Sequence, residues 1–276
     1  GREGMSRDRI FLAAALDPRH FKTDLAGLLK TRVKVAWDSQ QDRFLAEEIE
    51  ELGSIVVARK ALPSVPKEEK CAVLLDLIRT RGLSLLPWTE SILNWQARIA
   101  CLHELDTNKA AEGWPIVDND SLMATLELWL APFLDDVSHI NHFAKLDLAG
   151  ILKNRLSWEQ AQELDRLFPL RYAVPSGSNI AINYRQSPPI LAVRLQEMLG
   201  CVDNPALASG RVPLLLHLLT PAQRPLAVTQ DLQSFWTNAY PQVKKEYKGR
   251  YPKHHWPDDP LSAQPSARAK PRSQKQ

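Results

Sequence analysis

The stretch LTPAQRPLAVTQDLQSFWTNAYPQVKKEYKGRYPKHHWPDDP, Leu219–Pro260, places a helical pattern, a run of lysines and a proline-rich end one after another. Leu232, Trp236 and Tyr240 recur at helical spacing, and Thr229 is the predicted N-cap of that helix. The prolines that follow restrict the backbone and do not continue a helix. The stretch therefore predicts a helix followed by a stiff, extended strap.

The last twelve residues of this stretch, Gly249–Pro260, allow three interpretations: a metal site, a nucleic-acid contact or a structural strap. His254, His255, Asp258 and Asp259 are nitrogen and oxygen donors that a metal could use. Neighbouring histidines tend to point apart, however, and the prolines limit how the chain can close around an ion. We therefore predict no metal site here.

The nucleic-acid interpretation places cations on phosphates and aromatic rings on bases. The alternative is that the aromatic rings pin the proline-stiffened segment to the body of the protein, which their burial would stabilise. We favour the strap, and a strap can still hold a basic face outward. The candidate contacts in this stretch are Lys244, Lys245, Lys248, Arg250, Lys253, Tyr251 and Trp256.

Charge is unevenly distributed along the chain of 276 residues. The formal net charge is +3, but Pro241–Gln276 holds nine Lys/Arg against three Asp/Glu, an excess of +6 that leaves −3 for the first 240 residues. A basic end on a slightly acidic body is typical of a surface that meets a polyanion. A solvated tail without a partner has the same composition, so charge alone leaves both interpretations open.

The N-terminal part, residues 1–62, has the pattern of a small β module. Arg32–Trp37 alternates, Asp38–Asp42 reads as a hairpin loop, and Ile10–Leu16 is a short apolar run. Phe44–Leu52 fits either a strand or a helix. Together these segments predict a small barrel.

Residues 63–169 change to a helical period and predict a helical block. Helices are expected from Pro66 to a cap at Gly82, after Thr89, after the Asp118–Asp120 cluster as a single helix, and from a capping box made by Ser157 and Gln160.

Residues 170–260 predict a mixed region. Two strands flank the turn at residues 176–178, a helix is expected from Ser187 to Gly200, and Arg211–Leu219 reads as a buried strand. Residues 261–276 lack a hydrophobic set and predict a disordered basic tail. The expected fold class is thus α+β with several modules.

No catalytic motif is present in the sequence. The phosphate-binding patterns GxxxxGK[ST] and GxGxxG, the HExxH metal motif and the GxSxG elbow are all missing, so no catalytic residue is predicted. Cys71, Cys101 and Cys201 form no CxxC pair, which favours a reducing, cytoplasmic location. No apolar run is long enough for a membrane span. The opening GREGMSRDR does not resemble a signal peptide, which indicates a chain taken from something larger.

With these patterns in view, Leu219–Pro260 resembles the characteristic end of the HrpB-type bacterial DExH-box helicases. Weaker similarity extends upstream through RLQEMLG (Arg194–Gly200), GLSLLPWT (Gly82–Thr89) and VAWDSQQDRFLAEEIEELG (Val35–Gly53). These stretches are spread over most of the chain.

The resemblance implies an ATP-dependent RNA helicase as the parent protein. Such helicases carry two RecA-like motor domains, then winged-helix, helical-bundle and oligonucleotide-binding-fold modules, and then a family-specific C-terminal region. This chain would begin near the oligonucleotide-binding fold. The P-loop, the acidic Walker box and the arginine finger are missing, so ATP and Mg²⁺ would belong to the parent, and this chain alone is predicted to be non-catalytic, with no cofactor.

The same resemblance places residues 1–62 along the RNA path. The candidate contacts there are Lys30, Arg32, Lys34 and Arg43, for which ordinary surface charge is the alternative interpretation. The expected partners are RNA or another single-stranded nucleic acid and the missing motor domains in cis, with no membrane.

Two functions remain open at this point: an accessory nucleic-acid-binding region of the helicase, which we favour, and a protein-interaction or architectural platform. The second rests on tryptophans that could make one side adhesive to protein partners, namely Trp88, Trp95, Trp114 and Trp129. An independent metal-dependent enzyme built on the histidine-rich segment is the least favoured interpretation.

Overall fold

The computed structural model describes residues 17–105 and 113–268. The chain divides into two compact units: the first unit is Gly1–Leu85 with Ala131–Lys145, and the second unit is Leu86–Leu130 with Leu146–Gln276. The apolar run expected at residues 10–16 lies outside the described residues. Helices and strands occur in both units, which confirms a mixed α+β architecture.

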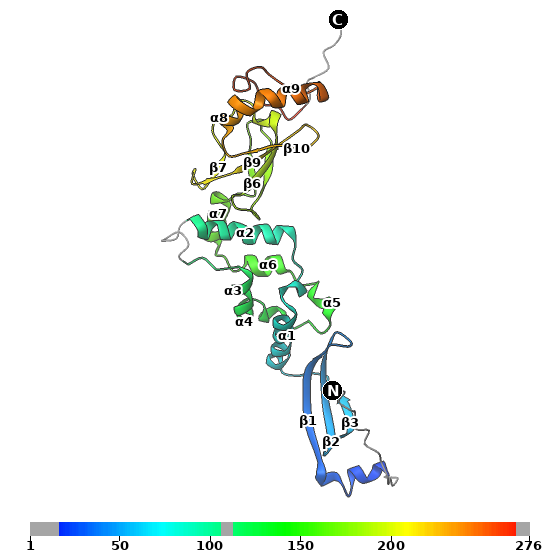
Figure 1. Cartoon of the computed structure of the whole chain (residues 1–276). Coiled ribbons are helices and arrows are strands. Elements are labelled where there is room, and N and C mark those ends of the chain that lie inside the picture. The colour runs from blue at the N-terminus through cyan, green and yellow to red at the C-terminus, as the bar shows by residue number, and fades with distance from the viewer. Residues whose placement is uncertain (1–16, 106–112, 269–276) are drawn as a thin grey trace, which may run out of the picture. The chain divides into compact units, whose positions relative to one another are not determined.

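The first unit is built on an antiparallel meander of β1 (Leu29–Asp38), β2 (Arg43–Leu52) and β3 (Ile55–Ala61), visible in blue and cyan in Figure 1. The hairpin loop predicted between the first two strands is confirmed. The Asp38 carboxylate accepts the backbone N–H of Gln40 at 2.9 Å and so stabilises the turn. The segment whose pattern fitted either a helix or a strand is β2, the central strand.

The expected barrel is not seen. In the described part of the first unit the sheet has the order β1-β2-β3, and its outer strands do not pair with each other. One end of the sheet is covered instead by helices. Trp37 on β1 lies 6.5 Å from the ring of Phe143, in α5 (Ile140–Phe143), and the Lys70 ammonium of α1 (Lys67–Arg81) lies 5.7 Å from the Phe44 ring.

The helix predicted to end at Gly82 is confirmed as α1. Glu68 and Glu69 lie in its first turn, where carboxylates favour the positive end of the helix dipole. At its other end Gly82 has a φ of 89°, and its N–H donates to the Ile78 carbonyl at 2.7 Å. Such a φ suits glycine, which explains why the helix ends there.

The helical part of the second unit comprises α2 (Glu90–Leu105), α3 (Asn119–Ala124), α4 (Leu126–Trp129), α6 (Leu148–Lys153) and α7 (Trp158–Leu167). The single helix expected after Asp118 is wrong, because the chain breaks at Thr125, whose hydroxyl donates to the Ser121 carbonyl at 2.7 Å. The capping box at Ser157 is confirmed: its hydroxyl accepts the Gln160 N–H at 3.2 Å, and the Gln160 side chain accepts the Ser157 N–H at 2.9 Å.

A buried cation ties α2 to the end of α7. Arg98 is 3% exposed, and its guanidinium donates to the carbonyls of Phe168 at 2.6 Å and Leu164 at 3.3 Å. It also donates to the Asp165 carboxylate at 2.5 Å. The Phe168 carbonyl is at the C-cap of α7, where a helix leaves carbonyls without a helical partner, whereas the Leu164 carbonyl also accepts the Phe168 N–H at 2.9 Å.

The remainder of the second unit contains a five-stranded sheet in the order β10-β9-β6-β5-β4, where β6 and β9 are parallel. A small ribbon pairs β7 with β8. The bounds are β4 (Arg171–Ala173), β5 (Asn179–Asn183), β6 (Ile190–Arg194), β7 (Ala206–Leu207), β8 (Val212–Pro213), β9 (Leu215–Leu219) and β10 (Pro225–Thr229). The strands expected on either side of the turn at 176–178 are β4 and β5, and the buried strand expected in 211–219 is β9.

The helix expected from Ser187 to Gly200 is wrong. Residues 190–194 are the central strand β6, and only residues 195–198 turn into a short 3-10 helix. Leu191 and Val193 are almost completely buried, because β6 pairs with both β5 and β9. These pairings with distant strands override the local pattern.

The end of the described chain differs from the disordered tail expected over 261–276. The Gly200 N–H donates to the Pro260 carbonyl at 2.9 Å, and the Ser266 N–H donates to the Gln196 carbonyl at 2.9 Å. The first residues of the expected tail therefore contact the second unit, and residues 269–276 lie outside the described residues.

Cys101 on α2 gives a test of the packing of the second unit. Burial, with a smaller effect from the charge of Glu104, raises the pKa of its thiol to about 11. Only the thiolate is nucleophilic, so we expect alkylation of Cys101 at pH 8 to be at least about 100-fold slower in the folded protein than in urea. Mass spectrometry of the alkylated peptides measures both rates, and equal rates would contradict the packing described here.

None of the helices in the described part of the chain combines the length and the apolar character that a membrane span needs.

Candidate nucleic-acid interface

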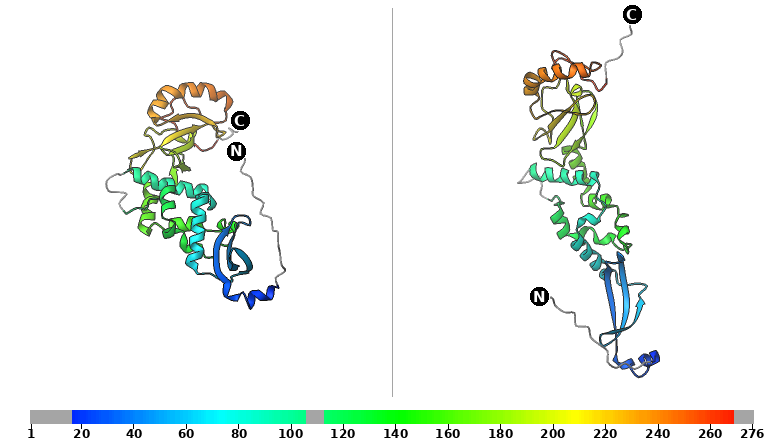
Figure 2. Two further views of the ribbon diagram at one scale, coloured as in Figure 1. Left: turned by 60° about the horizontal axis from the view of Figure 1, so that its bottom comes forward. Right: turned by 45° about the vertical axis from the view of Figure 1, so that its right-hand side comes forward.

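The basic segment near the C-terminus is helical. α8 (Leu232–Ser234) continues through one π-helical stretch, Phe235–Ala239, into α9 (Tyr240–Arg250). In Figures 1 and 2 this segment, coloured orange, lies next to the five-stranded sheet. Its lysines are therefore presented by a helix that the sheet supports.

The start of this helical segment corrects one prediction. The N-cap is Asp231, whose carboxylate accepts the Ser234 N–H at 2.8 Å. Thr229, the predicted cap, lies two residues earlier, where its hydroxyl oxygen accepts the Asp231 N–H at 2.9 Å. Both side chains satisfy backbone donors at the start of the helical segment.

The inner face of the helix is anchored by two aromatic residues with polar ends. Trp236 is buried, and its indole N–H donates to the Cys201 carbonyl at 2.7 Å. Tyr240 is 1% exposed, and its hydroxyl donates to the Pro257 carbonyl at 2.9 Å. Burial, with a smaller effect from the charge of Asp258, raises the pKa of Tyr240, so the hydroxyl stays a donor.

Residues 251–260, here called the strap, run back beside α9. Trp256 is 6% exposed and its indole N–H donates to the Tyr251 carbonyl at 3.1 Å. The ring of Tyr247, on α9, stacks on Trp256 with centroids 6.4 Å apart and on Tyr251 with centroids 6.3 Å apart. Three stacked rings thus fasten the strap to the helix.

These positions show how two predicted base contacts are packed. Trp256 is a candidate for stacking on a base, but its side chain is only 6% exposed and its ring stacks on Tyr247. Tyr251 is half-buried in the same stack. In this structure Trp256 anchors the strap, and its contact with a base stays a prediction.

A groove of about 940 Å³ lies between α9 and the strap, here called the α9–strap groove. One wall is a single face of the helix, because positions 241, 244, 245, 248 and 249 recur at helical spacing. The other wall is the proline-rich chain that returns from the end of α9. The groove is lined by Trp236, Tyr240, Pro241, Lys244, Lys245, Lys248, Gly249, Pro252, His254, His255, Trp256, Asp258 and Pro260.

The cations of the α9–strap groove differ in their environment. The Lys244 side chain is only 16% exposed and its ammonium forms an ion pair with the fully exposed Asp258. Lys245 and Lys248 are exposed. The hydrogen bond from Lys244, then its charge, and more weakly the charge of Lys248, lower the pKa of Asp258. The carboxylate is therefore ionised and lies in the positive field of two lysines.

His254 adds no positive charge to the groove at neutral pH. Burial, and then the nearby charge of Arg194, lower the pKa of its imidazole, which favours the neutral ring. Arg194 itself pairs with the buried carboxylate of Glu197 at 2.9 Å. Among the residues that the structure describes, no three His, Cys, Asp or Glu side chains come close enough together to hold a metal ion.

Two predicted cations lie outside the groove lining. Arg250, the last residue of α9, and Lys253, in the strap, are both exposed, but neither lines the α9–strap groove. Of the five predicted cations in this region, the structure brings together Lys244, Lys245 and Lys248.

The predicted contacts in the first unit face acidic partners. Lys30, Arg32 and Lys34 alternate along β1 and so share one face of the sheet. In the register of β1 and β2, Glu51 lies opposite Lys30 and Glu47 opposite Lys34. Sequence reasoning missed these acids, although the run EEIEEL on β2 places Glu47 and Glu51 on the same face of the strand.

Two ion pairs on this face of the sheet show that its glutamates neutralise part of the positive charge. Arg32 pairs with Glu51 at 2.7 Å, and Arg59 of β3 pairs with Glu47 at 3.3 Å. Arg43 is exposed at the start of β2, apart from this row. This surface is therefore more nearly neutral than its basic residues alone suggest.

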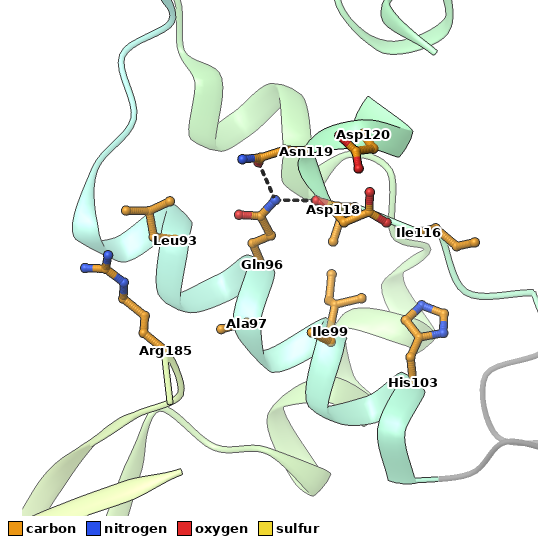
Figure 3. A pocket seen from close by; sticks show the side chains of 12 residues that line it. Leu93, Gln96, Ala97, Ile99, His103, Ile116, Asp118, Asn119, Asp120 and Arg185 are labelled. Atoms are coloured by element: carbon orange, nitrogen blue, oxygen red, sulfur yellow. Dashed lines mark hydrogen bonds between the residues drawn. The ribbon is translucent and has the colours of Figure 1, made fainter. Parts of the chain in front are cut away.

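A second groove, of about 930 Å³, lies beside α2 in the second unit (Figure 3). Gln96 projects from α2 and donates to Asn119 at 3.2 Å at the start of α3. Ile116 lies on its rim and is 57% exposed. The groove is lined by Leu93, Gln96, Ala97, Ile99, Ala100, His103, Ile116, Val117, Asp118, Asn119, Asp120 and Arg185.

The tryptophans proposed for an adhesive surface do not gather on one. Trp95 is 6% and Trp129 is 4% exposed, so both belong to the core of the second unit. Trp88 and Trp114 are half-buried.

Comparison with known proteins gives a consistent result. Residues 129–260 match the family model of the HrpB C-terminal region, described as "ATP-dependent helicase C-terminal". The chain is 42% identical over 267 residues to the ATP-dependent RNA helicase HrpB of Escherichia coli strain K12. This alignment covers 95% of this chain and 32% of that protein.

Two solved structures are similar. The crystal structure of the E. coli DExH-box NTPase HrpB superposes with a TM-score of 0.70 at 41% identity, covering 95% of this chain and 32% of that one. The crystal structure of the E. coli DEAH/RHA helicase HrpB gives a TM-score of 0.61 at 42% identity. This superposition covers 83% of this chain and 29% of that one. The chain thus spans about a third of the length of the relatives that it matches.

Proposed function

Because this chain belongs to the HrpB-type helicases and corresponds to their C-terminal part, we propose that it is an accessory region that binds single-stranded RNA for the helicase motor. One observation carries the proposal: Lys244, Lys245 and Lys248 line the same groove on one face of α9. Three cations at helical spacing suit the phosphates of a flexible strand.

In this proposal, ATP binding and unwinding belong to parts of the parent helicase that lie outside this chain. Motor domains that bind ATP and Mg²⁺ would supply the energy of unwinding in a cytoplasmic helicase. The modules proposed from the sequence, 1–62, 63–169, 170–260 and 261–276, would follow those domains. The three-stranded sheet of the first unit would occupy the place of the oligonucleotide-binding module.

The exposed lysines of the α9–strap groove provide the test. We expect Lys245→Ala and Lys248→Ala each to weaken binding of a labelled single-stranded RNA at low salt. Each variant should also reduce the slope of log K against log[salt] by ~0.7, because each removes about one phosphate contact and its released counterion. Fluorescence anisotropy at several salt concentrations measures both quantities.

Lys153 is the matched control for this test, because it is an exposed lysine of the second unit outside the groove lining. Lys153→Ala should leave the salt slope unchanged. If all three variants behave alike, or if the unchanged protein does not bind RNA at low salt, the proposed function is wrong.

The alternative function, a protein-interaction surface, is favoured by one observation, the groove beside α2. Its exposed apolar residue Ile116 and its acidic rim at Asp118 and Asp120 suit a basic amphipathic segment of a protein partner. Ile116→Asp would abolish such binding in a pull-down of nuclease-treated lysate. RNA binding, in contrast, would not change.

A further inference from the structure

Asp258 occupies the part of the α9–strap groove where a phosphate would be expected. Its carboxylate pairs with the Lys244 ammonium and lies within the electrostatic influence of Lys248. A carboxylate and a phosphate diester both present anionic oxygens to a lysine. The free protein therefore already holds an anion at its most buried groove cation.

The two members of this ion pair are unequally bound to the protein. The Lys244 side chain is 16% exposed, whereas the Asp258 side chain is fully exposed. A largely buried ammonium needs an anionic partner, because burial without one is unfavourable. A fully exposed carboxylate, in contrast, can leave for water at little cost. The arrangement is suited to the exchange of one anion for another at a fixed cation.

We propose that Lys244 and Lys248 form a binding site for one phosphate of a nucleic-acid backbone, which Asp258 occupies in the free protein and which a bound strand takes over. Asp258 then acts as an internal competitor that weakens binding and sets a threshold for the incoming anion. This inference rests on the proposed function and deepens it, because it names the position and the chemistry of one contact.

The test compares two neighbouring aspartates in the 276-residue chain. Asp258→Asn keeps the size of the side chain and a carbonyl oxygen that can still accept from Lys244, but it removes the competing charge. Asp259→Asn changes the net charge equally at a position outside the groove lining; its carboxylate accepts the Leu261 N–H at 2.9 Å, which an asparagine oxygen can still do. Thermal unfolding of both variants confirms that they fold.

We expect Asp258→Asn to bind single-stranded RNA about threefold to fivefold more tightly at low salt, and Asp259→Asn to differ from the unchanged protein by less than about twofold. The salt slope of Asp258→Asn should stay the same, because the bound strand places a phosphate on Lys244 in both proteins.

A third variant assigns the effect to the ion pair. Lys244→Met keeps the buried stem of the side chain but removes its charge. In this background Asp258→Asn should no longer raise the affinity, because the ammonium for which Asp258 and the phosphate compete is absent. If Asp258→Asn still raises the affinity by the same factor, the site at Lys244 is refuted.

Inorganic tripolyphosphate, titrated by calorimetry, separates this inference from the proposed function. Tighter tripolyphosphate binding by Asp258→Asn without any RNA binding would support the anion site and contradict the proposed function. If Asp258→Asn and Asp259→Asn behave alike with both ligands, the inference is wrong, and the lysine variants still decide the proposed function on their own. If no variant binds either ligand, both are wrong.

Discussion

Trp256→Ala is expected to lower the free energy of unfolding of the second unit by about 3–5 kcal/mol, the usual cost of truncating a buried tryptophan. The side chain is 6% exposed, its ring stacks on Tyr247, and its indole N–H donates to the Tyr251 carbonyl. Alanine would remove the stacking and the hydrogen bond and leave a cavity beneath the strap. Urea unfolding followed by far-ultraviolet circular dichroism measures the loss.

Trp158 is the control for this prediction, because it belongs to the same unit but is 73% exposed. Trp158→Ala should change the free energy of unfolding by no more than about 0.5 kcal/mol. The same pair of variants also separates two roles for Trp256. If Trp256→Ala lost RNA affinity at unchanged stability, the ring would be a contact for a base, and its assignment as an anchor of the strap would be wrong.

Arg98→Met is expected to cost a similar amount, about 3–5 kcal/mol, although methionine fills much of the same volume. The substitution leaves the Phe168 carbonyl at the end of α7 without its buried donor, and it leaves the Leu164 carbonyl with only the bond from the Phe168 N–H. It also releases Asp165, which is 66% exposed and can be hydrated. The largest part of the cost should therefore come from the lost bonds to these carbonyls, and chiefly from the bond to Phe168.

Asp165→Asn tests that division. It weakens the ion pair of Arg98 but keeps both backbone carbonyls paired, so we expect a loss of about 1 kcal/mol or less. Urea unfolding under identical conditions gives the comparison. Equal losses in the two variants would mean that the ion pair, and not the bonds to the carbonyls, holds α2 against α7.

Local sequence signals predicted the elements whose boundaries are set by neighbouring residues. Gly82 ends α1 because of its own φ, and Ser157 and Gln160 cap α7 through each other's backbone. Long-range pairing decided the rest. β6 carries apolar residues in a pattern that also suits a helix, and only its place between β5 and β9 makes it a strand.

The candidate site shows the same division between local and long-range causes. Helical spacing alone was enough to place Lys244, Lys245 and Lys248 on one face. It could not show that Asp258, fourteen positions beyond Lys244, returns to pair with it, nor that β2 sets Glu51 beside Arg32. Such partners depend on the path of the strap and on strand register, which the composition of each segment does not specify.

The stacked rings of Tyr251, Tyr247 and Trp256 also give the protein an optical reporter of its own. Chromophores held this close and nearly parallel couple electronically, so the near-ultraviolet dichroism of the stack depends on how the strap lies against α9. A ligand that shifts the strap would alter that signal without any added label. A ligand that binds in the α9–strap groove without moving the strap would leave the spectrum unchanged.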